Sequence, residues 1–149
     1  SLAGEIVADL DIEYSDLNGC DLDKEMAKLM IDEYPILSVA AAFANSPSIF
    51  RGLSELKVKE SDRLELIRLN LTKCGCECEV VNDDLLIKPS KNYIPIDRSI
   101  RTDFDHRIAM SFAVMGSKIG KLEIQDSDSI NTSFPNFFDT FNSAGGNIL

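Results

Sequence analysis

Residues 56–64 read LKVKESDRL and mark the predicted start of a helix at which two cations and a carboxylate meet. Lys59 and Arg63 lie one helical turn apart around Glu60. Ser61 or Asp62 can accept hydrogen bonds from the free backbone N–H groups of the first turn, as residues at helix starts commonly do. This stretch therefore organises the segment that follows it.

The segment that follows has the apolar spacing of an amphipathic helix over residues 61–74. Leu64, Ile67 and Leu71 recur on one face, and Gly75 suits the end of the helix. Backbone N–H groups, the positive end of the helix dipole and two cations would then point at one place, which predicts a site for a phosphate or carboxylate. The nine residues alone are equally compatible with ordinary surface charges at the start of a helix.

Composition narrows the classes of ligand. The chain has 149 residues, 44% of them hydrophobic, which suffices for a core of its own. Its net charge of −10 argues against a broad nucleic-acid or anionic-membrane surface, so an anionic ligand needs a local pocket of cations. We see neither an apolar run long enough to span a membrane nor a signal peptide, and expect a cytoplasmic protein. Because the sequence opens on Ser1, we expect part of a longer protein.

The cysteines do not form a recognisable metal motif. Cys74, Cys76 and Cys78 alternate, unlike the C-x-x-C pairs of structural zinc sites, and the chain has a single histidine. We expect reduced thiols and neither a metal nor another cofactor.

Alternating strand and helix patterns predict an α/β fold with helices packed on mixed, partly parallel sheets. The final helix is expected to be capped by Thr132 or Ser133, with Pro135 in its first turn. A linker is expected over residues 89–92. The expected strands cover residues 5–14, 49–53, 76–81, 85–88, 94–96 and 120–125, and the expected helices cover residues 22–30, 35–44, 61–74, 134–143 and a segment that begins near Asp105.

The pattern also repeats within the chain. Asp32 and Asp105 are 73 residues apart, and similar segments follow each of them. Polar residues lie where four of the expected helices begin. Alternating strands and helices tend to place such helix starts along one edge of the sheet, where open α/β folds bind ligands. We therefore expect four helix starts to face one cleft: those at Asp32, at residues 61–63, at residues 105–107 and at residues 132–133.

Four motifs in this order resemble the family of 5-enolpyruvylshikimate-3-phosphate synthase, or 3-phosphoshikimate 1-carboxyvinyltransferase: DEYPILSVAAAFA at 32–44, KVKESDRL at 57–64, DHRIAMSFAV at 105–114 and SFPNFF at 133–138. The resemblance implies an enzyme of two domains built from βαβαββ units, with its active site between the domains. This chain would be a partial C-terminal domain, with one unit at about residues 1–90 and a second at about residues 91–149.

The resemblance also implies a reaction without cofactors, in which the enolpyruvyl group of phosphoenolpyruvate moves to the 5-hydroxyl of shikimate 3-phosphate and phosphate is released. Asp32 matches the proton acceptor for that hydroxyl, and Glu60 matches the residue that transfers a proton at the methylene carbon. The remaining matches bind the two substrates: Lys59 at the shikimate phosphate and reacting centre, Arg63 and Arg107 at phosphoenolpyruvate, and His106 beside them.

One departure and two alternatives stand beside this reading. Thr132 occupies a position where many family members carry a lysine. Most contacts to shikimate 3-phosphate would come from the N-terminal domain, so the isolated chain is expected to be inactive. The main alternative is a non-catalytic anion-binding or structural module of the same fold. A related transferase that acts on a nucleotide sugar is not expected to combine the motifs at 57–64 and 105–114.

Overall fold

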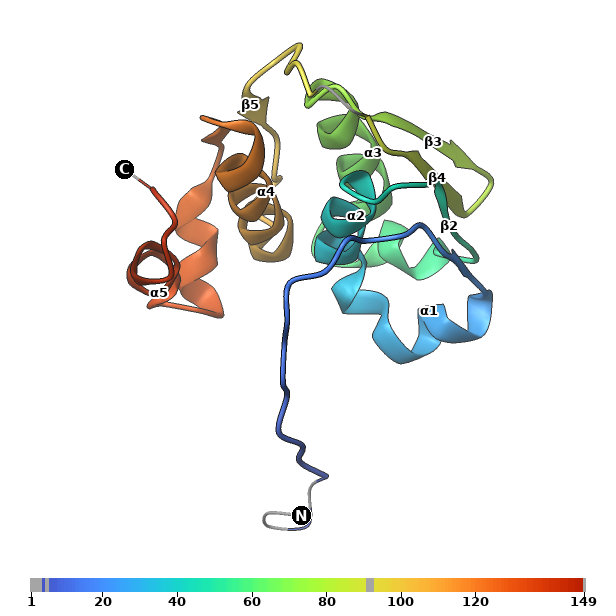
Figure 1. Ribbon diagram of the computed structural model, residues 1–149, viewed down its shortest axis with the longest axis horizontal. Helices are drawn as coiled ribbons and strands as arrows, with labels where there is room; N and C mark the ends of the chain where they lie inside the picture. The colour runs from blue at the N-terminus through green and yellow to red at the C-terminus, as the bar shows by residue number, and fades with distance from the viewer. Residues whose placement is uncertain (1–3, 5, 91–92, 149) are drawn as a thin grey trace.

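The computed structural model describes residues 4, 6–90 and 93–148, in which short strands alternate with helices (Figure 1). The strands are β1 (Asp21–Leu22), β2 (Ser48–Phe50), β3 (Glu77–Val81), β4 (Asp84–Lys88), β5 (Ser99–Ile100) and β6 (Glu123–Ile124). The α-helices are α1 (Lys24–Met30), α2 (Tyr34–Ala42), α3 (Arg63–Lys73), α4 (His106–Ile119) and α5 (Phe137–Ser143). Short 3₁₀ helices are η1 (Ile31–Glu33), η2 (Ser54–Val58) and η3 (Ser127–Thr132).

The strands form two sheets. The larger sheet has the order β1-β2-β4-β3, in which β1 and β2 are parallel and the other neighbours are antiparallel. β5 and β6 form a separate parallel pair. Helices separate the members of each parallel pair along the chain, as parallel connections require. The predicted α/β class with mixed sheets is confirmed, whereas the two repeat units remain a prediction.

Helices α2, α3 and α4 contribute many of the buried side chains of the core, and all three follow the predicted apolar patterns. α3 packs against β3 and buries Leu64, Ile67 and Leu71. α2, which is apolar on most sides, packs against both α3 and α4. α4 lies between the sheet-bearing part of the molecule and α5 (Figure 1). The starts of these three helices are consequently held at fixed positions by buried side chains.

Two predicted strands do not form in the described parts of their segments. Residue 5 lies outside the described residues, and residues 6–14 run away from the body without a strand partner among those described (Figure 1). Ile6 is 97% exposed, so the alternating pattern buries nothing here. Ile94 and Ile96 are also exposed, and the backbone N–H of Ile96 donates to the carbonyl of Lys73, the last residue of α3. A strand needs a neighbouring strand as well as a period of two, and neither segment has one among the described residues.

The start of the last helix was also predicted wrongly. Thr132 lies in η3, where its hydroxyl donates to the carbonyl of Ser129 instead of capping a helix. α5 begins at Phe137, and its cap residue, Asn136, makes no side-chain cap hydrogen bond. Pro135 therefore precedes the helix. Residues 91 and 92 of the expected linker lie outside the described residues.

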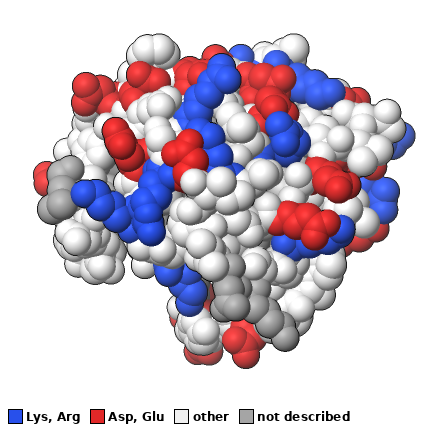
Figure 2. Space-filling model, turned by 90° about the horizontal axis from the view of Figure 1, so that it is seen from above, with Lys and Arg blue, Asp and Glu red and all other residues white. Residues whose placement is uncertain are grey.

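Cationic and anionic side chains are interspersed on the face shown in Figure 2. Over the described part of the chain, no helix has both the length and the apolar character required to cross a membrane.

Candidate active site

The start of α3 places a buried arginine at the centre of the site. Asp62 caps this helix, because its side chain accepts a hydrogen bond from the backbone N–H of Glu65. Arg63 is the first residue of the helix, and its side chain is 0% exposed. Lys59 and Glu60 lie just before it, between η2 and the cap. Lys59, Glu60 and Arg63 therefore reach the site from one short segment of the chain.

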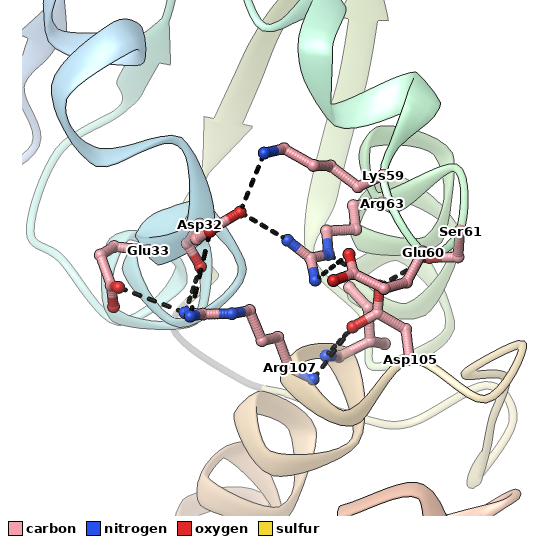
Figure 3. Close-up of polar contacts among 9 residues, drawn as sticks. Asp32, Glu33, Lys59, Glu60, Ser61, Arg63, Asp105 and Arg107 are labelled. Carbon is pink, nitrogen blue, oxygen red and sulfur yellow. Dashed lines mark hydrogen bonds and ion pairs between the residues drawn. The ribbon is translucent and has the colours of Figure 1, made fainter. Parts of the chain in front are cut away.

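Arg63 contacts three carboxylates that come from three different segments (Figure 3). Its Nε donates to Oδ2 of Asp105 at 2.7 Å, and its Nη1 donates to Oδ1 of Asp32 at 2.8 Å. Nη2 lies 2.5 Å from Oε2 of Glu60 as an ion pair. That pair is not aligned as a hydrogen bond, and Nη2 has no hydrogen-bond acceptor among the described residues. Within the described part of the chain, Nη2 is therefore a buried donor whose only charged contact is the exposed side chain of Glu60.

Two further cations reach Asp32, which lies in η1 at the entry to α2. Nζ of Lys59 lies 3.4 Å from Oδ1 of Asp32. Nη1 of Arg107 donates to the backbone carbonyl of Asp32 at 3.0 Å and to Oε1 of Glu33 at 3.2 Å. Nη2 of Arg107 lies 4.0 Å from Oδ2 of Asp32. A hollow of about 220 Å³ adjoins this contact, lined in part by Asp32, Glu33 and Arg107.

The start of α4 is tied to the same cluster by Asp105. The carboxylate caps the helix by accepting from the backbone N–H groups of Arg107 and Ile108. It also accepts from Ser61 Oγ at 2.9 Å and from Arg63. The side chain of Asp105 is 0% exposed, so Arg63 and Asp105 form a fully buried ion pair.

The surrounding cations lower the pKa of both aspartates. Burial is the largest single influence and opposes ionisation, but hydrogen bonds and positive charges together outweigh it. At Asp32 the opposing groups are Lys59, Arg107 and Arg63, and the net effect lowers its pKa below the ordinary value. At Asp105 they are Arg63, Ser61 and the helix N–H of Arg107, and the pKa is again lowered. Both carboxylates are therefore ionised at neutral pH.

The arrangement of charges also raises the pKa of Arg63. Burial disfavours the charged guanidinium most strongly, but Asp105, Glu60 and Asp32 together favour it by more. Arg63 is thus a permanent, oriented cation suited to a phosphate or carboxylate.

The structure brings five of the six predicted site residues into one set of contacts: Asp32, Lys59, Glu60, Arg63 and Arg107 (Figure 3). His106 is half-buried at the first position of α4, and no hydrogen bond or ion pair joins it to this set within the described residues. Three of the four predicted helix starts meet here. The fourth, at residues 132–133, makes no such contact in the described part of the chain and is not a helix start.

Three contributors to the site were not among the predicted site residues: Glu33, Ser61 and Asp105. Each of them contacts one of the predicted cations or its partner. Asp105 was expected at a helix start, and its position directly before His106 and Arg107 is the signal that could have indicated a second role. Within the described residues, no group of three or more histidine, cysteine or acidic side chains is arranged to hold a metal.

The residues of this cluster lie in a region that is shared with known proteins. The sequence profile of EPSP synthase (3-phosphoshikimate 1-carboxyvinyltransferase) matches residues 5–141, which include every residue of the cluster. The chain belongs to the EPSP synthase family. The resemblance noted in the sequence is therefore confirmed.

Curated relatives and solved structures agree with this family. The 3-phosphoshikimate 1-carboxyvinyltransferase of Paramagnetospirillum magneticum is 48% identical over 147 residues, which are 98% of this chain and 33% of the relative. That of Gluconobacter oxydans is 45% identical over 97% of this chain and 33% of the relative. An EPSP synthase structure from Acinetobacter baumannii superposes with a TM-score of 0.78 at 33% identity, over 87% of this chain and 30% of that one. The chain spans about a third of the length of the curated relatives it matches.

Proposed function

We propose that the enzyme containing this chain transfers the enolpyruvyl group of phosphoenolpyruvate to the 5-hydroxyl of shikimate 3-phosphate and releases phosphate. This chain would supply the wall that binds phosphoenolpyruvate. The observation that supports the proposal is the convergence of Lys59, Arg63 and Arg107 on Asp32 at the starts of α2, α3 and α4. A fixed group of cations around a carboxylate suits a ligand that is anionic at both ends and reacts in the middle.

The reaction needs two proton transfers. Addition delivers one proton to the methylene carbon of phosphoenolpyruvate and removes another from the 5-hydroxyl, and elimination reverses the direction. Asp32 is the acceptor for the hydroxyl proton, and its lowered pKa keeps it ionised before the substrates bind. Glu60, which is 53% exposed, transfers the proton at the methylene carbon.

Substrate anions compete with the protein's own carboxylates for the cations. Arg63 and Arg107 bind phosphoenolpyruvate, Lys59 contacts the shikimate phosphate and the reacting centre, and His106 orients the ligand phosphate. When the ligands draw these cations away from Asp32, the interactions that lower its pKa weaken. Asp32 then becomes a better base in the complex than in the free protein.

The cluster alone is electrostatically insufficient for two polyanionic substrates. It holds three cations, Lys59, Arg63 and Arg107, against four carboxylates, Asp32, Glu33, Glu60 and Asp105. We therefore propose that further cations come from the rest of the enzyme, in particular from its N-terminal domain. In this proposal the chain forms the later part of the second domain, with two units that divide near residue 90, and the enzyme acts in the cytoplasm.

A reconstitution experiment tests this function. The chain alone should release little or no phosphate from phosphoenolpyruvate, whereas the chain combined with a separately produced remainder of the enzyme should release it only when shikimate 3-phosphate is present. The non-catalytic alternative makes a different prediction. If the two parts are folded and associated, and phosphoenolpyruvate binds without any release of phosphate, the chain is a binding module and the proposed activity is wrong.

A further inference from the structure

Asp105 connects the two helix starts that carry the arginines, and its two carboxylate oxygens have separate partners. Oδ1 accepts from the backbone N–H groups of Arg107 at 3.0 Å and Ile108 at 3.4 Å. Oδ2 accepts from Arg63 Nε at 2.7 Å and Ser61 Oγ at 2.9 Å. One oxygen thus caps α4, and the other holds the side chain that begins α3 (Figure 3).

We propose that Asp105 is a positioning residue for phosphoenolpyruvate, an inference that rests on the proposed function. A guanidinium is planar, so hydrogen bonds at Nε and Nη1 fix the direction of the third nitrogen. In Arg63 these two positions are bonded to Asp105 and Asp32, and the buried Nη2 lies beside the exposed Glu60 without an aligned acceptor among the described residues. Through Oδ1, the same carboxylate also fixes the first turn of α4, from which Arg107 extends.

A residue that only capped a helix would not need its second carboxylate oxygen to bind the side chain of another helix. Asp23 caps α1 in the same way, because its Oδ1 accepts from the backbone N–H groups of Glu25 and Met26. None of the ion pairs in the described part of the chain involves Asp23. Asp105 differs because its second oxygen is buried against a cation from another helix.

The two roles can be separated by a single substitution. Asp105→Asn retains a carbonyl oxygen that can cap α4, since asparagine is a good cap residue. Its amide NH₂ would then take the place of Oδ2 and face the Nε–H of Arg63, so that one donor meets another. The cap is preserved while the guanidinium loses its orientation.

The test is steady-state kinetics of the full-length enzyme that carries this chain. We expect Asp105→Asn to raise the KM for phosphoenolpyruvate about tenfold or more, because a misplaced binding group loses much of its effect. The KM for shikimate 3-phosphate should stay within about twofold, and kcat should change less than the KM for phosphoenolpyruvate. The matched control, Asp23→Asn, also replaces a capping aspartate and should leave both KM values unchanged.

Other outcomes overturn the inference. Unchanged KM values, or an equal rise in both, would show that Asp105 serves only as a cap or as general support. If Asp105→Asn does not fold, Ser61→Ala decides, because it removes one donor from Oδ2; we expect the KM for phosphoenolpyruvate to rise about threefold, and no rise refutes the role. A wild-type enzyme inactive with both substrates refutes the proposed function itself, and the inference with it. An active wild type with an unaffected variant refutes the positioning role alone.

Discussion

Replacing Arg63 with methionine should reveal how much of the fold depends on the buried ion pair. Methionine can occupy part of the space of the arginine stem but leaves Asp105, which is 0% exposed, as a buried carboxylate without its cation. Breaking a buried pair in this way costs about 3–5 kcal/mol. The contacts to Asp32 and Glu60 add less than about 1 kcal/mol each, because those carboxylates are 42% and 53% exposed and can return to water.

The assay is denaturant unfolding at neutral pH, with Arg68→Met as the matched control. Arg68 lies on the same helix and pairs with Glu65, but both side chains are substantially exposed, so its loss should cost less than about 1 kcal/mol. Adding Asp105→Asn to Arg63→Met should recover part of the loss, with a coupling energy of about 2–3 kcal/mol. Equal, small losses for Arg63→Met and Arg68→Met would refute the view that the pair is buried and strong.

Acid provides a second test of the same pair. In the wild type the pKa of Asp105 lies below its ordinary value of 3.8, so its stabilising effect is complete above the unfolded-state pKa and is lost as the pH falls through the lower folded value. Without Arg63, burial dominates and raises the pKa of Asp105, so acid should relieve the variant by protonating the carboxylate. As the pH falls, the difference in unfolding free energy between wild type and Arg63→Met should therefore shrink, first as the variant's carboxylate takes up a proton at its raised pKa and then, below about pH 4, as the wild type loses its own stabilisation. A constant difference would contradict the assignment.

Three other predictions concern a turn, the thiols and the proposed chemistry. In thermal unfolding, Gly75→Ala should lower the stability by about 1–3 kcal/mol, because φ at Gly75 is +86° and a Cβ there would lie 2.7 Å from a carbonyl oxygen. The control is Gly116→Ala inside α4, which should be neutral or stabilising in the same assay. A thiol reagent should modify the exposed Cys20 quickly and the other three cysteines only on unfolding. Burial raises the pKa values of these three thiols to between about 11 and about 12, so few of them are thiolates at neutral pH. Rapid reaction of more than one thiol would count against the described core. In the complete enzyme, Glu60→Gln should lower kcat about 100-fold or more with little change in KM, and unchanged turnover would remove Glu60 from the proton transfer.

The sequence predicted the helices better than the strands, for a physical reason. A helix satisfies its own backbone hydrogen bonds, so apolar spacing and a cap residue were enough to predict α3 and α4, and an apolar run that begins at a proline was enough to predict α2. A strand is satisfied only by its neighbours. Residues 6–14 alternate as a strand would, yet remain exposed, whereas the two-residue strands β1 and β5 are too short to show a pattern.

What the sequence alone determined is local: the family motifs, the residues that cap α3 and α4, and the chemical types of the charged groups. Each of these depends on residues within a few positions of one another. Only the tertiary structure decided which charges meet. Arg63 is joined to Asp32 and Asp105, 31 and 42 positions away, because the packing of α2, α3 and α4 sets the distances between their first turns. The same packing buries Asp105, and burial turns a capping carboxylate into a partner of the arginine.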